Sequence, residues 1–501
     1  MSELNELEQL RRDKAEKLRQ QGVDPYPPRS ARTHTSLEAV RAFEAAPDTD
    51  EVRATLVGRM RSVRRMGKVI FAHVEDGDGQ IQLYFRQDDL GEERLRQFDD
   101  LYDLGDFIQA SGKLFRTRSG EVTLHVEAFT MLAKAISPLP ASKEEIVDGE
   151  RVVYSAFDNP EARYRERYAD LAVNPEVRQV FRTRARVVRA LQQFLDGRGF
   201  VEVETPILQP TYGGAAARPF LTHHNQLHQD LYLRISFELY LKRLLVGGLE
   251  RVYEIGRDFR NEGVSYRHNP EFTMLEFYMA YADYRDVMAL TEEMVAFTAQ
   301  QVIGSTTIRA RGQEVELAPP WRRIELRQAL IDHAGVDIAE YPSADSLRQA
   351  MVARGHEPSP ASTRGKLIES LLTTYVEPAL IQPTFVYDYP RDISPLAKSK
   401  PGEAGTVERF EGYIAGMELC NAFTELNDPV DQEARFTEMG RDYAAEDEDR
   451  HPMDEDYLRA MRYGMPPNGG FGMGIDRLAM VLTGRPTIRE VILYPHLRSK
   501  E

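Results

Sequence analysis

Cationic, aromatic and acidic side chains are concentrated in one polar stretch of the sequence, residues 254–276. Val252 to Arg260 alternates in the manner of a strand, and Phe272 to Tyr278 is rich in residues that favour strands. The turn-forming residues His268-Asn-Pro lie between them, so the stretch is predicted to fold as strand, polar loop and strand.

The second of these strands is predicted to offer one face to a ligand. Side chains alternate along a strand, and one face would carry Phe272, Met274, Glu276 and Tyr278. An aromatic ring can stack on a nucleobase, and a buried carboxylate can bind a cation.

Basic residues of the same stretch suit phosphate oxygens, because arginine makes bidentate, charge-assisted hydrogen bonds to them. The candidates are Arg260, Arg267 and His268. The side chains of Glu254, Arg260 and Glu262 would share one face of the first strand if that strand extended to residue 262. The alternative is a surface hairpin crossed by salt bridges, since charge clusters are often only structural.

Residues 409–425 predict a second hairpin, with its turn at residues 415–416. In a two-residue turn Tyr413 lies opposite Glu418, and Glu411 lies diagonally on the same face. Adjacent carboxylates repel unless a cation lies between them, and Mg²⁺ prefers one or two carboxylates together with substrate oxygens. The alternative is a solvated acidic strand face.

The same hairpin carries Asn421, Phe423 and Glu425, whose parity is opposite to that of Glu418. A strand of regular pleat would place these side chains on the other face of the sheet. A β-bulge at residues 419–420 would bring all of them to one site.

Residues 469–477 alternate glycine with apolar residues before the pattern becomes helical. A strand with glycine along one face admits a flat group, such as a nucleotide ring, against its backbone. Arg477, at the junction of strand and helix, suits a phosphate. The pattern is not a GxGxxG dinucleotide motif, because its glycines repeat every second residue and no βαβ unit surrounds them.

A chain of 501 residues is expected to form two or three domains. Residues 53–132 contain five short alternating strands, which predict a small closed barrel of the OB-fold type, and an amphipathic helix over residues 4–21 precedes them. Basic groups interleaved with aromatic rings suit the stacking of unpaired bases, although Phe71 fits the barrel core equally well. The basic and aromatic residues concerned are Arg59, Arg61, Arg64, Arg65, Lys68, Phe71, Tyr84 and Phe85.

Further elements follow the barrel. Residues 173–195 predict a helix and residues 199–208 a strand, which suit either a dimer interface or plain core. Glu238 lies in the first turn of another predicted helix, where the helix dipole favours a carboxylate. Residues 284–380 are predicted to be mostly helical and peripheral, with a hairpin near 308–317.

Composition excludes several classes of protein. The apolar content of 42% and charged content of 29% are typical of soluble globular proteins, and no apolar run approaches the roughly 20 residues of a membrane span. The single cysteine, Cys420, excludes a disulfide framework or multi-cysteine zinc site and suits a reducing cytoplasm. The net charge of −16 argues against nonspecific polyanion binding but permits a local basic patch that contacts RNA.

Three stretches, in this order, resemble the signature motifs of class II aminoacyl-tRNA synthetases. They are residues 199–208 with Pro206, Phe259-Arg-Asn-Glu262 with its loop and Phe272, and the glycine strand that ends at Arg477. The longer segments Gly213-Gly-Ala-Ala-Ala-Arg-Pro-Phe, His268-Asn-Pro-Glu-Phe-Thr-Met-Leu-Glu and Phe423-Thr-Glu-Leu-Asn-Asp-Pro are similar to lysyl-tRNA synthetases of the bacterial class II type. The similarity runs from about residue 53 to the C-terminus and is weakest in 300–375 and 398–405.

This resemblance implies an α+β fold in two parts. Residues 1–145 would form the N-terminal helix and an OB-fold that binds the anticodon. Residues 146–501 would form a class II catalytic domain, an antiparallel sheet flanked by helices, with a mostly helical insertion around 300–380. The implied enzyme is a cytoplasmic homodimer that activates L-lysine with ATP and Mg²⁺ and transfers it to the 3′ end of tRNA(Lys).

The resemblance also assigns roles to matching positions. Arg260 and Arg477 would be catalytic, with Arg260 on the α-phosphate and the lysine carboxylate. The implied ATP site is Arg260, Glu262, Arg267, His268, Phe272, Glu411 and Arg477, with the adenine between Phe272 and Arg477. The implied Mg²⁺ ligands are Glu411 and Glu418. The implied lysine site is Gly214, Glu238, Arg260, Glu276, Tyr278, Asn421, Phe423 and Glu425. The implied anticodon contacts are Arg59, Arg61, Phe71 and Gln82.

One departure and two alternatives accompany this assignment. The third motif commonly ends in Glu-Arg, whereas this chain has Asp476-Arg477. Aspartyl- and asparaginyl-tRNA synthetases share the layout, but they would require a cation or amide-matching groups in the pocket. A noncatalytic tRNA-binding or regulatory paralogue is the other alternative, and the retained Arg260, Glu411 and Glu418 argue against it.

Overall fold

The computed structural model describes residues 5–46, 51–140, 142–147, 150–155, 157–360, 362–403, 405–442 and 452–498. It divides into two compact units, residues 1–159 and 160–501. The boundary predicted at residue 145 falls inside a hairpin, β6 (Ser142–Val147) and β7 (Glu150–Ser155), whose strands pair with each other in the first unit. Among the described residues, no helix is long and apolar enough to cross a membrane.

The first unit is built on a closed five-stranded barrel with strand order β1-β2-β3-β5-β4, which confirms the predicted OB-fold. Its strands are β1 (Arg53–Met66), β2 (Val69–Glu75), β3 (Gln80–Arg86), β4 (Phe107–Arg116) and β5 (Val122–Ala133). Alternate residues such as Leu56, Ile70 and Leu83 are buried, as the two-residue period of a strand requires.

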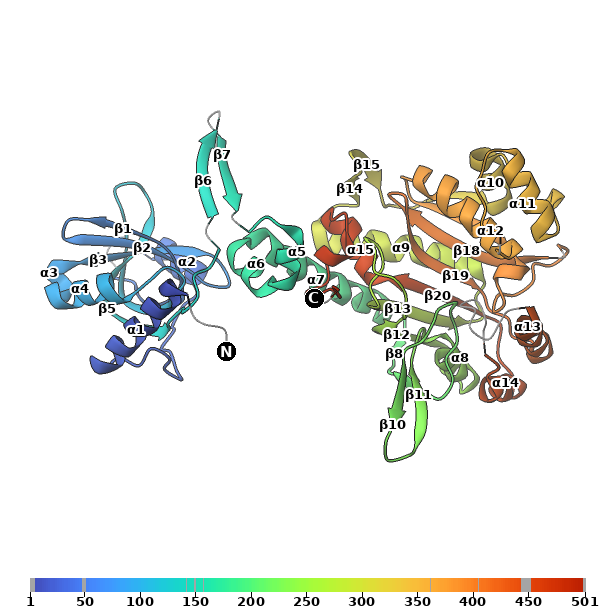
Figure 1. Cartoon of the computed structure of the whole chain (residues 1–501), viewed down its shortest axis with the longest axis horizontal. Coiled ribbons are helices and arrows are strands. Elements are labelled where there is room, and N and C mark those ends of the chain that lie inside the picture. Colours follow the sequence, from blue (N-terminus) through green and yellow to red (C-terminus); the bar gives the residue numbers. More distant parts are fainter. Residues whose placement is uncertain are drawn as a thin grey trace. The chain divides into compact units, whose positions relative to one another are not determined.

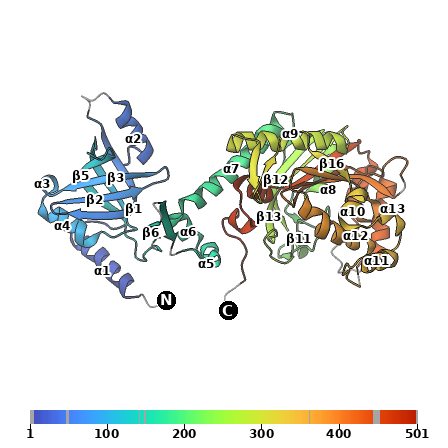
Figure 2. The ribbon, with the colours of Figure 1, turned by 90° about the horizontal axis from the view of Figure 1, so that it is seen from above.

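The described residues of this unit also form the helices α1 (Glu6–Gln20), α2 (Ser36–Ala45), α3 (Gln87–Leu90) and α4 (Glu92–Leu101). Asn5 and Glu8 form a capping box at the start of α1, which satisfies backbone N–H groups that the helix itself cannot bond. Figure 2 shows α1 and α2 on different sides of the barrel.

The second unit contains an eight-stranded sheet with the order β16-β17-β18-β19-β20-β13-β12-β8 (Figure 1). Neighbouring strands are antiparallel except for the pairs β16–β17 and β12–β8. Strands from distant parts of the sequence thus become neighbours, above all β13, β19 and β20. The strands are β8 (Val201–Glu202), β12 (Arg251–Phe259), β13 (Glu271–Ala280), β16 (Arg322–Glu325), β17 (Thr384–Pro390), β18 (Thr406–Ile414), β19 (Met417–Thr424) and β20 (Asn468–Gly474).

Helices pack against this sheet and build its core. Val187, Leu191, Phe277, Phe471 and Leu478 belong to one buried cluster that joins α7 and α15 to strands β13 and β20. The helices are α5 (Pro160–Arg165), α6 (Arg167–Val173), α7 (Pro175–Asp196), α8 (Glu238–Val246), α9 (Tyr284–Ile303), α10 (Leu326–Ala334), α11 (Ala344–Ala353), α12 (Arg364–Leu371), α13 (Pro429–Asp442), α14 (Glu455–Arg462) and α15 (Ile475–Thr483).

Two small sheets complete the unit. One contains β9 (Leu208–Gln209), β10 (Leu221–His224) and β11 (Gln229–Leu233), and the other contains β14 (Thr307–Ala310) and β15 (Gln313–Glu316). Within the predicted insertion, α10, α11 and α12 lie together (Figure 1). They share a separate apolar cluster.

The strand predicted over residues 199–208 is shorter in the structure, where β8 spans two residues. Thr205 leaves the sheet because its backbone N–H and its hydroxyl both donate to the Glu254 carboxylate, at 3.0 and 2.7 Å. Pro206 follows it and has no N–H for a strand ladder.

Candidate active site

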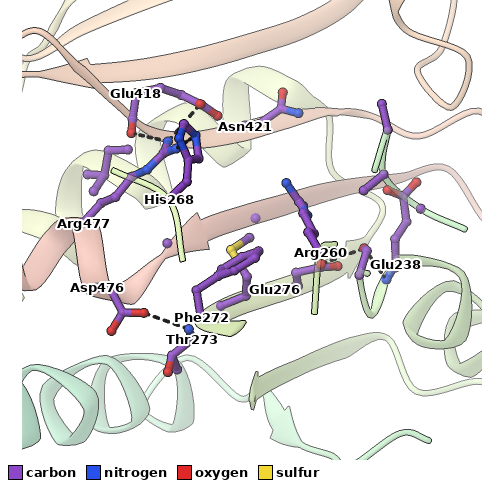
Figure 3. A pocket seen from close by; sticks show the side chains of 18 of the residues that line it. Glu238, Arg260, His268, Phe272, Thr273, Glu276, Glu418, Asn421, Asp476 and Arg477 are labelled. Atoms are coloured by element: carbon purple, nitrogen blue, oxygen red, sulfur yellow. Dashed lines mark hydrogen bonds and ion pairs between the residues drawn. The ribbon is translucent and has the colours of Figure 1, made fainter. Parts of the chain in front are cut away.

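A cavity of about 520 Å³ lies over the central strands β13, β19 and β20. Figure 3 shows Arg477, His268 and Glu418 together at one end, Glu238 at the other, and Arg260, Phe272 and Glu276 between them. All predicted site residues of this unit line the cavity except Glu411. Those that line it are Gly214, Glu238, Arg260, Glu262, Arg267, His268, Phe272, Glu276, Tyr278, Glu418, Asn421, Phe423, Glu425 and Arg477.

The end of the cavity that contains Arg477 and His268 is cationic. Arg477, in the first turn of α15, donates to the backbone carbonyl and the carboxylate of Glu418 at 2.8 and 2.9 Å. Its other terminal nitrogen lies 3.4 Å from Nε2 of His268. Burial and the charge of Arg477 lower the pKa of His268, which favours the neutral imidazole, a group that can both accept and donate a hydrogen bond.

Arg260 lies at the centre of the cavity, one residue beyond the end of β12. Its guanidinium is 5.1 Å from the centre of the Phe272 ring and makes long contacts, 3.4 and 3.5 Å, to the Ile235 carbonyl. Because these contacts are weak, the guanidinium retains N–H donors that can bind an anion.

The predicted common face of Glu254, Arg260 and Glu262 does not form. Strand β12 ends at Phe259, so Arg260 and Glu262 lie beyond the pleat that would align them with Glu254. Glu254 instead accepts a hydrogen bond from Arg234 at 2.6 Å and is buried away from the cavity lining.

The far end of the cavity is acidic. Glu276, on β13, accepts hydrogen bonds from the Ser236 hydroxyl at 2.7 Å, the Phe237 N–H at 3.2 Å and the Tyr278 hydroxyl at 3.1 Å. These three donors fix both of its oxygens. Burial, together with the negative charge of Glu238, raises the pKa of Glu276 to about 7.

A residue that sequence reasoning missed, Lys242 on α8, connects the other two acidic residues. Its Nζ donates to Oε1 of Glu238 at 2.5 Å and forms an ion pair with Oε2 of Glu425. Oε1 of Glu425 accepts no hydrogen bond from the described residues. The four-residue spacing of Glu238 and Lys242 on a helix was the signal that could have revealed the pair.

The bulge predicted in the second hairpin is present. Gly412 pairs with Cys420, and Tyr413 pairs with Glu418, which leaves Leu419 as the additional residue of β19. The change of register brings the residues after the bulge to the same cavity as Glu418, namely Asn421, Phe423 and Glu425.

Glu411 lies behind the cavity wall and is bound within the protein. Arg409 donates to one of its oxygens at 2.6 Å, and the Tyr413 hydroxyl donates to the other. Burial raises the pKa of Glu411, and the charge of nearby Glu418 adds to the rise. Arg409, also missed from the sequence, donates to the side-chain oxygen of Asn421 at 3.0 Å and so fixes that amide.

The glycines of β20 serve a different purpose at each position. A Cβ at Gly470 would lie 1.8 Å from Oε1 of Glu425 and 2.5 Å from the Tyr278 ring. This glycine therefore makes room for a carboxylate, whereas the sequence had suggested room for a nucleotide ring. A Cβ at Gly472 would lie 3.3 Å from the terminal carbon of Met274 in the cavity wall.

Two family models cover most of the chain. Residues 159–498 match the tRNA synthetases class II (D, K and N), and residues 54–132 match the OB-fold nucleic acid binding domain. This chain belongs to the class II tRNA synthetases.

Full-length relatives carry the name lysine–tRNA ligase. The protein from Roseiflexus castenholzii is 53% identical over 500 residues, and the alignment covers 100% of both chains. The protein from Chloroflexus aurantiacus is 52% identical over 99% of both chains. The protein from Bacillus subtilis is 46% identical over 99% of this chain and 98% of its own.

Asp476 shows how this synthetase departs from the commoner Glu-Arg ending of the third motif. Its side chain is buried and accepts hydrogen bonds from Arg184 on α7 at 2.7 Å and from the Thr273 N–H on β13 at 2.9 Å. The aspartate thereby ties three elements together directly beside Arg477, which is a supporting role.

Predicted nucleic-acid contacts lie on the barrel of the first unit. Phe71 is half-buried on the outer surface, 5.2 Å from the Tyr84 ring, and the Arg64 guanidinium lies 5.5 Å from its centre. Phe85 belongs to the barrel core. The rings of Phe71 and Tyr84 therefore lie outside the barrel core.

The other three predicted contacts have protein partners. The Arg59 guanidinium lies 4.2 Å from the centre of the Phe107 ring, and Arg61 pairs with Glu75 at 2.9 Å. Gln82 is buried and donates to a carboxylate at 2.9 Å, so its amide is oriented by the barrel.

Proposed function

We propose that this chain is a lysine–tRNA ligase, which activates L-lysine with ATP and transfers it to the 3′ end of tRNA(Lys). The observation that carries the proposal is the burial of Glu238, Glu276 and Glu425 in the same cavity as Arg260 and Arg477. A buried ammonium requires carboxylate partners, whereas an aspartate side chain would require a cation. Incubation with ATP, tRNA and labelled lysine should yield lysyl-tRNA, and a preference for aspartate or asparagine would refute the proposal.

The lysine carboxylate acts as the nucleophile in the first step. One of its oxygens attacks the α-phosphorus of ATP, the bond to the β-phosphate oxygen breaks, and pyrophosphate leaves with that electron pair. Arg260 orients both reactants and stabilises the negative charge that accumulates on the α-phosphate. Arg267, His268 and Arg477 supply the remaining positive or hydrogen-bonding groups around the triphosphate.

A terminal ribose hydroxyl of the tRNA then attacks the carbonyl carbon of lysyl-adenylate. The new ester bond joins lysine to the tRNA, and AMP leaves with the electrons of the broken carbonyl–phosphate bond. The barrel would hold the anticodon through Arg59, Arg61, Phe71 and Gln82 during this step.

Of the two carboxylates assigned to Mg²⁺, Glu418 lines the cavity, where it would hold the ion together with phosphate oxygens of ATP. Glu411 could join it only after releasing Arg409 and the Tyr413 hydroxyl, which hold both of its oxygens. When bound, the ion would neutralise part of the triphosphate charge.

We also propose a homodimer that works in the cytoplasm, where tRNA is charged for protein synthesis. Val201 and Leu208 of the first motif are 49% and 48% exposed, and Leu221 on β10 is 62% exposed; exposed apolar side chains of this kind can form an association face where they are contiguous. An association face would bury them, and the mass measured in solution should be twice that of one chain.

Lysine binding should weaken as the pH falls. A carboxylate binds an ammonium only when ionised, and burial with the charge of Glu238 raises the pKa of Glu276 to about 7. Protonation between pH 8 and pH 6 should therefore raise the KM for lysine roughly tenfold. Lysine-dependent ATP–pyrophosphate exchange, measured across this pH range, gives the KM for lysine, and the KM for ATP serves as an internal control. A constant lysine KM over this range would contradict the role of Glu276.

Phe71→Ala should lower tRNA charging roughly tenfold while leaving adenylate formation unchanged, because loss of one stacked base costs about 1–3 kcal/mol. Aminoacylation and ATP–pyrophosphate exchange separate the two steps. Phe43→Ala, on α2, is the matched control and should change neither rate. Equal losses in both assays would show that Phe71 has no separate role in tRNA binding.

A further inference from the structure

Lys242 is buried at the acidic end of the cavity. Its side chain is fully buried, and its ammonium lies between Glu238 and Glu425. The rings of Phe423 and Tyr457 lie 5.5 and 6.0 Å from Nζ. A cation of the protein therefore contacts two of the three carboxylates that we propose as partners of the substrate ammonium.

The charges explain why such a cation is needed. Burial raises the pKa of Glu238 and of Glu425, and the positive charge of Lys242 opposes that rise in both. Burial alone would lower the pKa of Lys242, but the two carboxylates outweigh it. Three buried carboxylates without a resident cation would repel one another and favour their protonated forms.

Lys242 also limits which hydrogen bonds a ligand can make. It occupies one oxygen of Glu238 and one of Glu425. Each of these residues therefore has one oxygen that Lys242 does not contact, while the contacted oxygen retains a single lone pair. Both oxygens of Glu276 already accept hydrogen bonds from Ser236 and Tyr278.

Single acceptors on separate residues suit an ammonium, whose three N–H bonds point in different directions. A planar guanidinium binds a carboxylate best through two parallel hydrogen bonds, which need both oxygens of one residue. The arrangement of Lys242, Glu238 and Glu425 thus favours a primary amine over a guanidinium.

We propose that Lys242 is a positioning residue that holds Glu238 and Glu425 for an ammonium and thereby excludes arginine. This inference rests on the proposed lysine activity. It predicts that removal of the Lys242 ammonium weakens lysine binding and frees paired carboxylate oxygens for a guanidinium.

The test is Lys242→Met, assayed by ATP–pyrophosphate exchange with lysine and with arginine. The KM for lysine should rise roughly tenfold or more with little change in kcat, and the preference in kcat/KM for lysine over arginine should fall at least tenfold. Arg243→Met is the matched control, because Arg243 is the next residue of α8 and pairs with Asp454 at 2.8 Å. This control should keep both the lysine KM and the preference.

Thermal unfolding of each variant shows whether Lys242→Met is folded. If it is not, the double variant Lys242→Met/Glu425→Gln removes one negative and one positive charge together. The lysine KM of the double variant should be no higher than that of Glu425→Gln alone. If the two substitutions acted independently, their increases in the lysine KM would multiply.

The outcomes distinguish a failure of the proposed function from a failure of the role of Lys242. Wild-type protein without lysine-dependent exchange would refute the proposed function. Wild-type activity combined with an unchanged lysine KM and unchanged rejection of arginine in folded Lys242→Met would overturn the role of Lys242 alone. Multiplicative effects in the double variant would also overturn it.

Discussion

Arg260→Ala is expected to lower lysine-dependent ATP–pyrophosphate exchange by roughly 10²–10³-fold, the effect of removing a main donor to developing negative charge. Arg260 lies between the cationic and acidic ends of the cavity, where the α-phosphate and the lysine carboxylate must meet (Figure 3). Its guanidinium makes long contacts to the protein, so its donors are available to those two anions. The loss should therefore fall mainly on kcat.

Arg257→Ala is the matched control for this experiment. Arg257 lies on β12, three residues before Arg260, and is half-exposed, with a carboxylate 3.9 Å away in Glu271. This exposed pair contributes little, so exchange should stay near the wild-type rate. Near-normal exchange in Arg260→Ala would remove that arginine from the chemistry.

Glu276→Gln should raise the KM for lysine by about 100-fold, because it removes a buried negative charge from the acidic end of the cavity. The glutamine has the same shape and can still accept hydrogen bonds from Ser236 and Phe237, which separates charge from packing. The KM for ATP should change little, since we propose that the triphosphate binds at the other end.

Two comparisons sharpen this result. Glu271→Gln, at the exposed start of the same strand, should leave the lysine KM unchanged. The dependence of the lysine KM on pH should also become weaker in Glu276→Gln, because a group with a pKa of about 7 has been removed. A lysine KM close to the wild-type value would show that Glu276 does not bind the ammonium.

Strand alternation made much of the cavity predictable from the sequence. The faces of residues 272–278 follow from the pleat, and Glu276 and Tyr278 both reach the cavity. The mismatch in parity between Glu418 and Asn421 also predicted the bulge that the structure contains. Local periodicity was enough in these cases because each depends on neighbouring residues alone.

Contacts between distant segments were harder to predict. The ion pair of Lys242 with Glu425 joins a helix to a strand far along the chain, and no local pattern encodes it. The short strand β8 likewise depends on the bond from Thr205 to Glu254, a tertiary contact. Arg409 and Tyr413, which hold Glu411 behind the wall, are by contrast only two residues from it on β18, so the pleat of that strand could have revealed them.

ATP–pyrophosphate exchange with each of the twenty amino acids tests the central claim most directly. A cavity with cationic groups at one end and three buried carboxylates at the other should support exchange with lysine at a kcat/KM far above that of every other amino acid. Comparable exchange with aspartate or asparagine, or no exchange with lysine, would contradict the account.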